Sequence, residues 1–163
     1  MNPSLQIRTI EQSDNAQLAA IVRNTLTEFG CNKPGTAWAD PETDFLYEQF
    51  QDMRTQYFVA VLNDEIVGGA GIGFLKGYND ICELQKMYLK PHARGQGIAG
   101  QLMQRCVAFA TAKNFSQIYL ETMTALSIAV AFYESNGFVF LDKPLSQTGH
   151  FSCNIQMIKS LTI

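Results

Sequence analysis

The spacing of hydrophobic residues in the first third of the chain predicts one strand and two helices. Apolar and polar residues alternate over residues 5–10, which is typical of a short strand. Over residues 16–29 the apolar positions recur every three or four residues, which predicts an amphipathic helix that ends at Gly30. A loop over residues 30–42 then leads into a second expected helix over residues 42–53.

Two β-rich runs follow, over residues 56–62 and 66–75, and the Asn-Asp pair between them is a turn signal. They predict an antiparallel hairpin. The second run contains four glycines, which would suit either a nucleotide-binding loop or a strand with bulges and close backbone contacts. No helical pattern follows these glycines, so we favour the strand with bulges.

The middle of the chain predicts a β-α-β crossover. An apolar strand over residues 81–90 leads through a glycine-rich turn, residues 94–100, into a helix over residues 101–112. A further strand is expected over residues 116–123. Strand, turn and helix in this order favour an anion site, because the turn exposes backbone N–H groups and the helix N-terminus carries partial positive charge.

The last part of the chain predicts one more helix and two strands. Thr124 or Ser127 is expected to cap the helix, which ends before Gly137. The two strands are expected over residues 138–141 and 150–158. The order of all these elements predicts one mixed α/β domain with an antiparallel first half.

Length and charge narrow the class of protein. A chain of 163 residues predicts a single domain, and a net charge of −3 argues against a nucleic-acid partner. The first residues show no basic and apolar leader, and no run of about 18 apolar residues could span a membrane. None of the four cysteines lies at metal-ligand spacing, so we expect no metal. Without a leader or a membrane span, the cytoplasm, where thiols stay reduced, is the expected compartment.

The glycine turn allows two interpretations. Gly95, Gly97 and Gly100 form a dinucleotide-type fingerprint, and Glu121 lies near the place of a ribose-binding acid. This interpretation would make the protein a nicotinamide-dependent oxidoreductase. It is the weaker one, because strands and helices precede the turn and too little chain follows it for a doubly wound sheet.

The second interpretation explains more residues. The turn reads Arg94-Gly95-Gln96-Gly97-Ile98-Ala99, the strand before it reads Glu-Leu-Gln-Lys-Met-Tyr-Leu-Lys-Pro, and residues 131–138 read Ala-Phe-Tyr-Glu-Ser-Asn-Gly-Phe. At this spacing the three pieces resemble the core of the GNAT superfamily of acyl-CoA-dependent N-acetyltransferases. Ala99 is an allowed variant of the family motif, and Ser127 stands where many members have an Asn that contacts the pantetheine arm.

The resemblance implies a fold and a cofactor. Residues 1–163 would form one N-acetyltransferase domain with a twisted, mostly antiparallel sheet of about seven strands. Strands 4 and 5 would splay apart, and about four helices would flank the sheet. Acetyl-CoA would be the co-substrate. Its contacts would come from the fourth strand, the glycine turn and the last helix: Met87, Tyr88, Leu89, His92, Arg94, Gly95, Gln96, Gly97, Ile98, Ala99, Gly100, Ser127 and Tyr133.

The resemblance also implies catalytic roles. Glu83 is the candidate base that removes a proton from the amine, although a carboxylate facing solvent is an equal alternative. The backbone N–H near Leu89 would stabilise the oxyanion, and Tyr133 would protonate the leaving thiolate. The acceptor pocket would come from the first two helices and the loops beside them, with Phe29, Trp38, Asp40, Asp44, Tyr47 and His150.

These expectations describe an enzyme that acetylates a primary amine of a small molecule or peptide. Asp40 and Asp44 would suit a cationic amine, although both could equally belong to a solvated face. A catalytically inactive acyl-CoA-binding regulatory module is the main alternative, and the oxidoreductase is a remote one. We expect no nucleic-acid or membrane partner, and a homodimer is left open.

Overall fold

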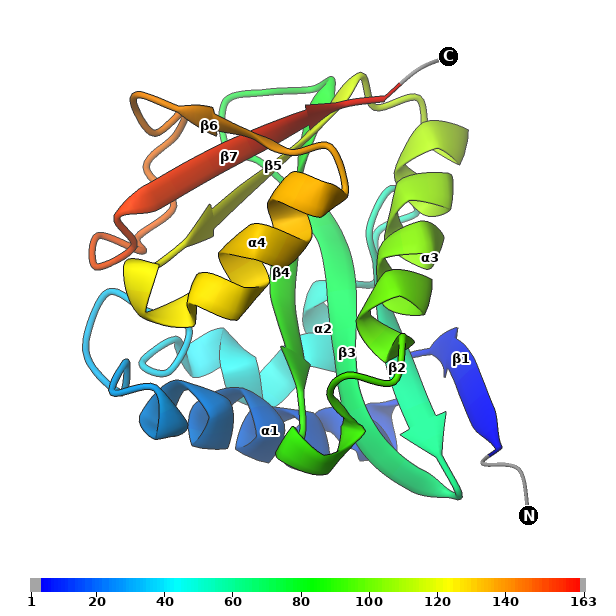
Figure 1. The fold of residues 1–163 in the computed structure, drawn as a ribbon. Coiled ribbons are helices and arrows are strands. Elements are labelled where there is room, and N and C mark those ends of the chain that lie inside the picture. Colours follow the sequence, from blue (N-terminus) through cyan, green and yellow to red (C-terminus); the bar gives the residue numbers. More distant parts are fainter. Residues whose placement is uncertain (1–3, 162–163) are drawn as a thin grey trace.

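A seven-stranded sheet forms the centre of the protein in the computed structural model, which describes residues 4–161 (Figure 1). The strand order is β1-β2-β3-β4-β5-β7-β6, and only β4 and β5 run parallel. The mixed, mostly antiparallel fold predicted from the sequence is therefore confirmed. The strands are β1 (Leu5–Thr9), β2 (Gln56–Leu62), β3 (Glu65–Phe74), β4 (Ile81–Leu89), β5 (Gln117–Thr122), β6 (Val139–Leu141) and β7 (Ile155–Ser160).

Helices cover both faces of this sheet. Within residues 4–161 they are α1 (Asn15–Glu28), α2 (Leu46–Gln49), α3 (Ile98–Ala112) and α4 (Ser127–Ser135). Figure 1 shows α3 and α4 in front of the sheet, with α1 running below the lower end of β4. No helix in this part of the chain is long and apolar enough to cross a membrane.

Strand β2 shows how the alternation of side chains builds two cores. Its residues Phe58 and Ala60 pack with α3 in the larger hydrophobic cluster. Tyr57 and Val59 point to the opposite face and pack with residues of α1 and with Leu46 of α2. Because successive side chains of a strand point to opposite faces, one apolar strand contributes to both layers.

The second expected helix is much shorter than the sequence pattern predicts. Residues 41–45 form a 3-10 turn, and α2 contains only one α-helical turn. Phe45 leaves the helical region with φ of −132° and ψ of 41°, and it is 58% exposed. A tight turn in which Asp52 accepts a hydrogen bond from the Arg54 amide ends the segment before β2. The predicted helix over residues 42–53 was therefore wrong.

Three smaller boundaries also differ from the predictions. Helix α3 begins at Ile98, three residues earlier than expected, because Gly97 is its N-cap. Neither Thr124 nor Ser127 caps α4 with its side chain, since a 3-10 turn leads into the helix. The last strand begins at Ile155, because the preceding residues form a loop whose Ser152 hydroxyl donates to Pro34.

The glycines of β3 occupy a strand with a bulge and close contacts, as predicted. The pairing between β3 and β4 shifts by one residue opposite Gly69 and Gly71. A Cβ atom at Gly71 would lie 2.6 Å from the Tyr57 ring, so glycine is required there. The Tyr57 hydroxyl passes across to β4 and donates a 2.7 Å hydrogen bond to the carbonyl of Lys86, whose φ is 49°. The small residues of β3 thus leave room for the Tyr57 side chain, whose hydroxyl holds the bulge of β4 in place.

Candidate active site

The sheet opens between β4 and β5. These parallel strands pair only through residues 81–83 and 117–119, whereas β4 continues to pair with β3 as far as Leu89. Figure 1 shows β5 leaning away from β4, with α4 in front of the gap. A cavity of about 500 Å³ occupies this gap. Within residues 4–161, the edge of β4 that faces β5 has no strand partner beyond Glu83.

Most of the residues predicted for the site lie on the wall of this cavity. They come from α1, β4, the turn before α3, the first turn of α3, α4 and the loop before β7. They are Phe29, Glu83, Met87, Tyr88, Leu89, Arg94, Gly95, Gly97, Ile98, Ala99, Gly100, Ser127, Tyr133 and His150.

The glycine turn closes one end of the cavity. Gly95 and Gly97 have φ of 73° and 77°, in the left-handed region that favours glycine. Gly97 is the N-cap of α3, and no side chain caps this helix end. Because Gly97 and the first residues of α3 line the cavity, the helix brings unpaired amide groups and partial positive charge to this end.

Arg94 fixes the turn to its surroundings. Its Nε donates a 3.1 Å hydrogen bond to the Leu89 carbonyl, and its two terminal nitrogens lie 2.9 and 2.8 Å from the carboxylate of Glu28. The hydrogen bonds from Arg94 to the carboxylate hold the pKa of Glu28 below its usual value. The guanidinium also lies over the Phe29 ring, 5.5 Å from its centre. Arg94 thereby links the end of β4 to the last turn of α1.

Two residues predicted to contact the cofactor lie outside the cavity wall. His92 points to Glu65, with its Nε2 3.2 Å from the carboxylate. Gln96 folds back and donates a 2.6 Å hydrogen bond to the His92 carbonyl. The structure therefore brings neither side chain to the cavity, and their cofactor role stays a prediction.

Glu83 lies where β4 and β5 separate. It belongs to the last paired residues of the two strands, lines the cavity and is only 8% exposed. Burial raises the pKa of its carboxyl to about 7, partly offset by a 2.8 Å hydrogen bond from Gln85 Nε2. A carboxyl with this pKa can exchange a proton near neutral pH.

The backbone at the other end of β4 points a donor into the gap. The Lys90 amide donates to the Val67 carbonyl on β3. Successive amides of a strand point to opposite edges, so the N–H of Leu89 faces the open edge. The Leu89 carbonyl faces the same way, since it accepts the hydrogen bond from Arg94.

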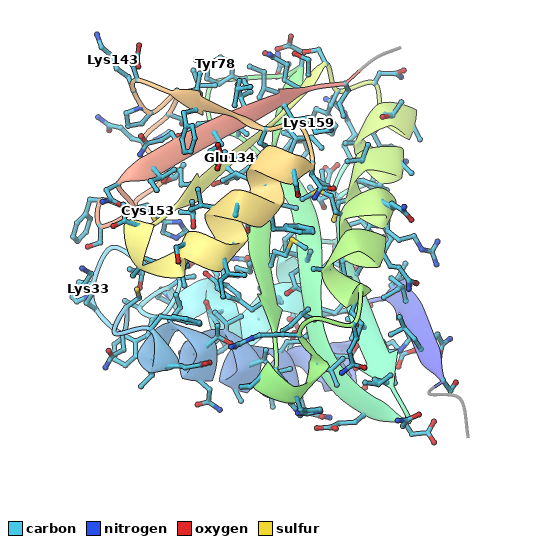
Figure 2. The ribbon with its side chains drawn as sticks, viewed as in Figure 1. Lys33, Tyr78, Glu134, Lys143, Cys153 and Lys159 are labelled. Carbon is cyan, nitrogen blue, oxygen red and sulfur yellow. The ribbon has the colours of Figure 1, made fainter. Side chains whose placement is uncertain are left out.

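Helix α4 supplies the opposite wall. Tyr133 is buried, and burial raises the pKa of its hydroxyl to about 12, so it is protonated at neutral pH. Its ring lies edge-to-face with Phe132 and Phe138, at centre distances of 5.9 and 5.8 Å. Ser127 lines the cavity at the first residue of the helix. Lys159 of β7, labelled in Figure 2, donates a hydrogen bond from its Nζ to the carbonyl of Asn136, the residue that ends α4. This hydrogen bond ties the end of α4 to β7.

The far end of the cavity contains a charged cluster. His150 Nε2 and Lys86 Nζ lie 2.7 and 3.1 Å from the same oxygen of Asp40, Oδ2. Burial would raise the pKa of Asp40, but the hydrogen bond from His150 and the charge of Lys86 outweigh it and hold this pKa below its usual value. The same hydrogen bond raises the pKa of His150. Lys86 and His150 line the cavity, whereas Asp40 lies behind them.

The remaining residues predicted for the acceptor pocket have other surroundings. Asp44 forms an exposed ion pair with Arg23, whose Nε also donates to the carbonyl of Trp38. Tyr47 packs beside the cluster formed by α1, α2 and β2. None of Trp38, Asp44 and Tyr47 lines the cavity. The two carboxylates expected to attract a cationic amine, Asp40 and Asp44, are instead paired with cations of the protein itself.

Sequence analysis missed several polar residues of the cavity wall: Gln85, Lys86, Glu121 and Cys153. One signal for the first two was present. The adjacent polar pair Gln85-Lys86 interrupts the alternation of the strand, which is typical of a bulge. Glu121 stands out in the sequence only as the acid of the oxidoreductase interpretation, and Cys153 carried no signal, because only the fold brings the two residues together.

Glu121, His150 and Cys153 form the candidate metal-binding group that the described part of the chain contains, with ligand atoms within 4.8 Å of one another. Figure 2 shows Cys153 in the loop that leads into β7, close to the start of α4. Burial raises the pKa of its thiol to about 12, which disfavours the thiolate that a metal requires. Both oxygens of Glu121 accept hydrogen bonds, from Tyr119 and Thr148. In the structure the carboxylate of this group is therefore engaged by hydroxyl groups, and the thiol is protonated.

The opened sheet and the glycine turn define the architecture of an acyltransferase, and comparison with known proteins identifies the family. Residues 21–138 match the model of the acetyltransferase (GNAT) family. The chain is 38% identical to the uncharacterized N-acetyltransferase YjgM of Escherichia coli over 157 residues, which cover 95% of this chain and 94% of that protein. The chain belongs to the GNAT family of acetyltransferases, as its sequence motifs predict.

Solved structures share the fold. An acetyltransferase of the GNAT family from Staphylococcus aureus superimposes with a TM-score of 0.87 at 22% identity, covering 98% of this chain and all of that one. The PaiA N-acetyltransferase of Thermoplasma acidophilum, solved in complex with coenzyme A, gives a TM-score of 0.73 at 18% identity, with coverage of 96% and 99%. These similarities confirm the fold predicted from the sequence.

Proposed function

We propose that residues 1–163 form one N-acetyltransferase domain that transfers an acetyl group from acetyl-CoA to a primary amine by direct attack. The observation that carries this proposal is the unpaired edge of β4, which runs from the glycine turn to the buried carboxyl of Glu83. An anion site, a backbone edge and a titratable base thus lie along one cavity. The four cysteines are free thiols, which suits a reducing cytoplasm.

The glycine turn would hold the pyrophosphate of acetyl-CoA. The amides of residues 95–100 and the N-terminus of α3 offer donors and partial positive charge to an anion. Open space lies above Gly95, Gly97 and Gly100, where a Cβ atom would meet no other atom within 4 Å. Phosphate oxygens could therefore approach the backbone closely. Arg94 can reach the phosphates once it leaves Glu28.

The pantetheine arm would lie along β4 as an added strand. The open edge of Met87, Tyr88 and Leu89 offers main-chain groups for this pairing. The Leu89 N–H, which faces the same edge beside the glycine turn, would donate to a carbonyl of the arm. Six residues of strand, about 20 Å, separate Leu89 from Glu83, so the two do not act on the same reacting carbonyl.

Glu83 and Tyr133 would move the protons. Glu83, with a pKa of about 7, takes a proton from the acceptor ammonium so that the neutral amine attacks the thioester carbonyl carbon. The new C–N bond forms and the C–S bond breaks. The thiolate of CoA leaves and takes a proton from Tyr133, whose hydroxyl is protonated at neutral pH. The nitrogen loses its second proton through water to the tyrosine, so the products are the amide, the CoA thiol and one proton held by Glu83.

Calorimetry and thiol release test the proposal together. Acetyl-CoA should bind with one site per chain, and a panel of primary amines should include at least one that releases free CoA thiol in a protein-dependent reaction. NADH should not bind. Binding of acetyl-CoA without turnover on any amine would instead favour the regulatory module, and absence of binding would refute both.

A further inference from the structure

Two basic side chains at the far end of the cavity share one carboxylate oxygen. Lys86 and His150 both approach Asp40 Oδ2 and both line the cavity, whereas Asp40 does not. Both basic side chains therefore face the space in which the acceptor would lie, whereas the carboxylate of Asp40 lies on their other side. Glu83 and Glu121 also line the cavity, so it offers both signs of charge, as a substrate with an amine and an anionic group requires.

Burial makes this arrangement informative. The side chain of Lys86 is only 7% exposed, and a buried ammonium group needs a partner. Its one carboxylate partner also serves His150, so two donors depend on a single oxygen. An ammonium group has three N–H donors, which leaves Lys86 able to bind a further anion.

The other ionisable groups at this end do not supply that anion. The oxygens of Glu121 accept hydrogen bonds from the Tyr119 and Thr148 hydroxyls, 2.7 Å each. Glu83 is hydrogen-bonded to Gln85. Cys153 is protonated at neutral pH, because burial raises the pKa of its thiol. The unused N–H donor capacity of Lys86, beside His150, therefore points to an anionic ligand.

We propose that the acceptor is an amino acid, whose carboxylate binds Lys86 and His150 while its amine approaches Glu83. This proposal rests on the proposed function and names its substrate class. Glu83 and Lys86 lie three positions apart on β4, and the bulge between β3 and β4 falls at Lys86. The hydrogen bond from the Tyr57 hydroxyl to the Lys86 carbonyl fixes this bulge. One supported strand segment thus presents a base and a cation to a small bifunctional substrate.

Matched pairs of substrates test the role of the carboxylate. Leucine, phenylalanine, glutamate and lysine would each be compared with the corresponding carboxamide, which keeps the shape and loses the charge. The amine of a carboxamide has the lower pKa and is more often neutral, so chemistry alone favours the amide. We expect kcat/KM to be at least about tenfold higher for one or more of the acids, mainly through KM.

Variants of Lys86 give the second readout. Lys86→Met should raise KM for the best amino acid roughly tenfold or more and leave KM for its carboxamide and the Kd for acetyl-CoA unchanged. Lys86→Arg keeps the charge and should retain most of the discrimination. Lys90→Met is the matched control, since Lys90 lies just beyond the same strand and pairs with exposed Glu65. It should change none of these constants.

The outcomes separate this inference from the proposed function. Turnover of simple amines or diamines with no preference for acids over amides would overturn the inference and leave the acetyltransferase proposal standing. If no compound is turned over, calorimetry of the same pairs on CoA-loaded protein decides. Tighter binding of an acid than of its amide, lost in Lys86→Met, supports the inference, and equal or absent binding of both overturns it.

Discussion

One end of the cavity is built from a single stretch of chain, whereas the other is assembled from segments that lie far apart in the sequence. The glycine turn and the start of α3 follow one another directly. The charged end brings together Asp40 from a loop, Lys86 from β4 and His150 from the loop before β7. The backbone serves the first end and side chains serve the second. Binding of a cofactor that is common to a family needs only the backbone end, whereas recognition of a particular acceptor requires the side-chain end.

The largest expected effect lies on β4 beyond Lys86, at Glu83. Glu83→Gln should lower kcat by about a hundredfold or more, because the amide cannot accept the proton of the amine. In the wild-type protein kcat/KM should rise with pH through about 7, as the carboxyl ionises. Steady-state kinetics between pH 5.5 and 9 measure both effects. Glu134→Gln, on the exposed surface of α4 (Figure 2), is the control. A pH profile that Glu83→Gln leaves unchanged would exclude this residue as the base.

The same substitution should change stability in a pH-dependent way. Glu83 has an ordinary pKa of 4.5 that burial raises to about 7, so between these values the folded protein holds a proton that the unfolded chain releases. Stability should therefore fall as pH rises from 4.5 through 7, by up to about 3 kcal/mol. Glu83→Gln should remove this loss. Urea denaturation at pH 4.5 and pH 8 measures it, and equal pH dependence in both proteins would contradict the buried-carboxyl account.

The backbone character of the turn end can be tested at Gly97. Alanine there is strained by about 1–2 kcal/mol, since φ is 77°, and its Cβ would occupy the space offered to the cofactor. Gly97→Ala should therefore unfold more easily and bind acetyl-CoA about tenfold more weakly. Gly77→Ala is matched in strain, with φ of 91°, but lies in the turn between β3 and β4. It should lose similar stability and keep its affinity. Equal Kd values of the two variants for acetyl-CoA would contradict a role of the glycine turn in binding the cofactor.

The smallest expected effect concerns Arg94. In the structure its two terminal nitrogens bind the carboxylate of Glu28, so Glu28 would compete with a phosphate for the guanidinium. Glu28→Gln should tighten acetyl-CoA binding by roughly two- to fivefold at low salt, and the difference should shrink as salt screens the pair. Calorimetry at two salt concentrations measures this. Weaker binding in Glu28→Gln would show that the pair organises the turn instead.

The comparison also explains what the sequence could reveal. Alternation and helical spacing depend on near neighbours, so the strands, α1, α3 and the glycine turn were predictable. The length of α2 was not, because the backbone at Phe45 and the turn at Asp52 override an apolar pattern. The partners of Asp40 were equally hidden, since 46 and 110 positions separate it from Lys86 and His150. Its carboxylate therefore looked available for a cationic ligand until the fold supplied two internal cations.

The short pairing between β4 and β5 has a further consequence, for hydrogen exchange. The Lys90 amide donates to β3 and should exchange slowly, whereas the Leu89 amide faces the open edge and should exchange fast. A ligand that adds itself to β4 as a strand would slow the second amide and leave the first unchanged. The exchange rate of the Leu89 amide, compared with that of its neighbour Lys90 in the same spectrum, would then show whether the slot is occupied.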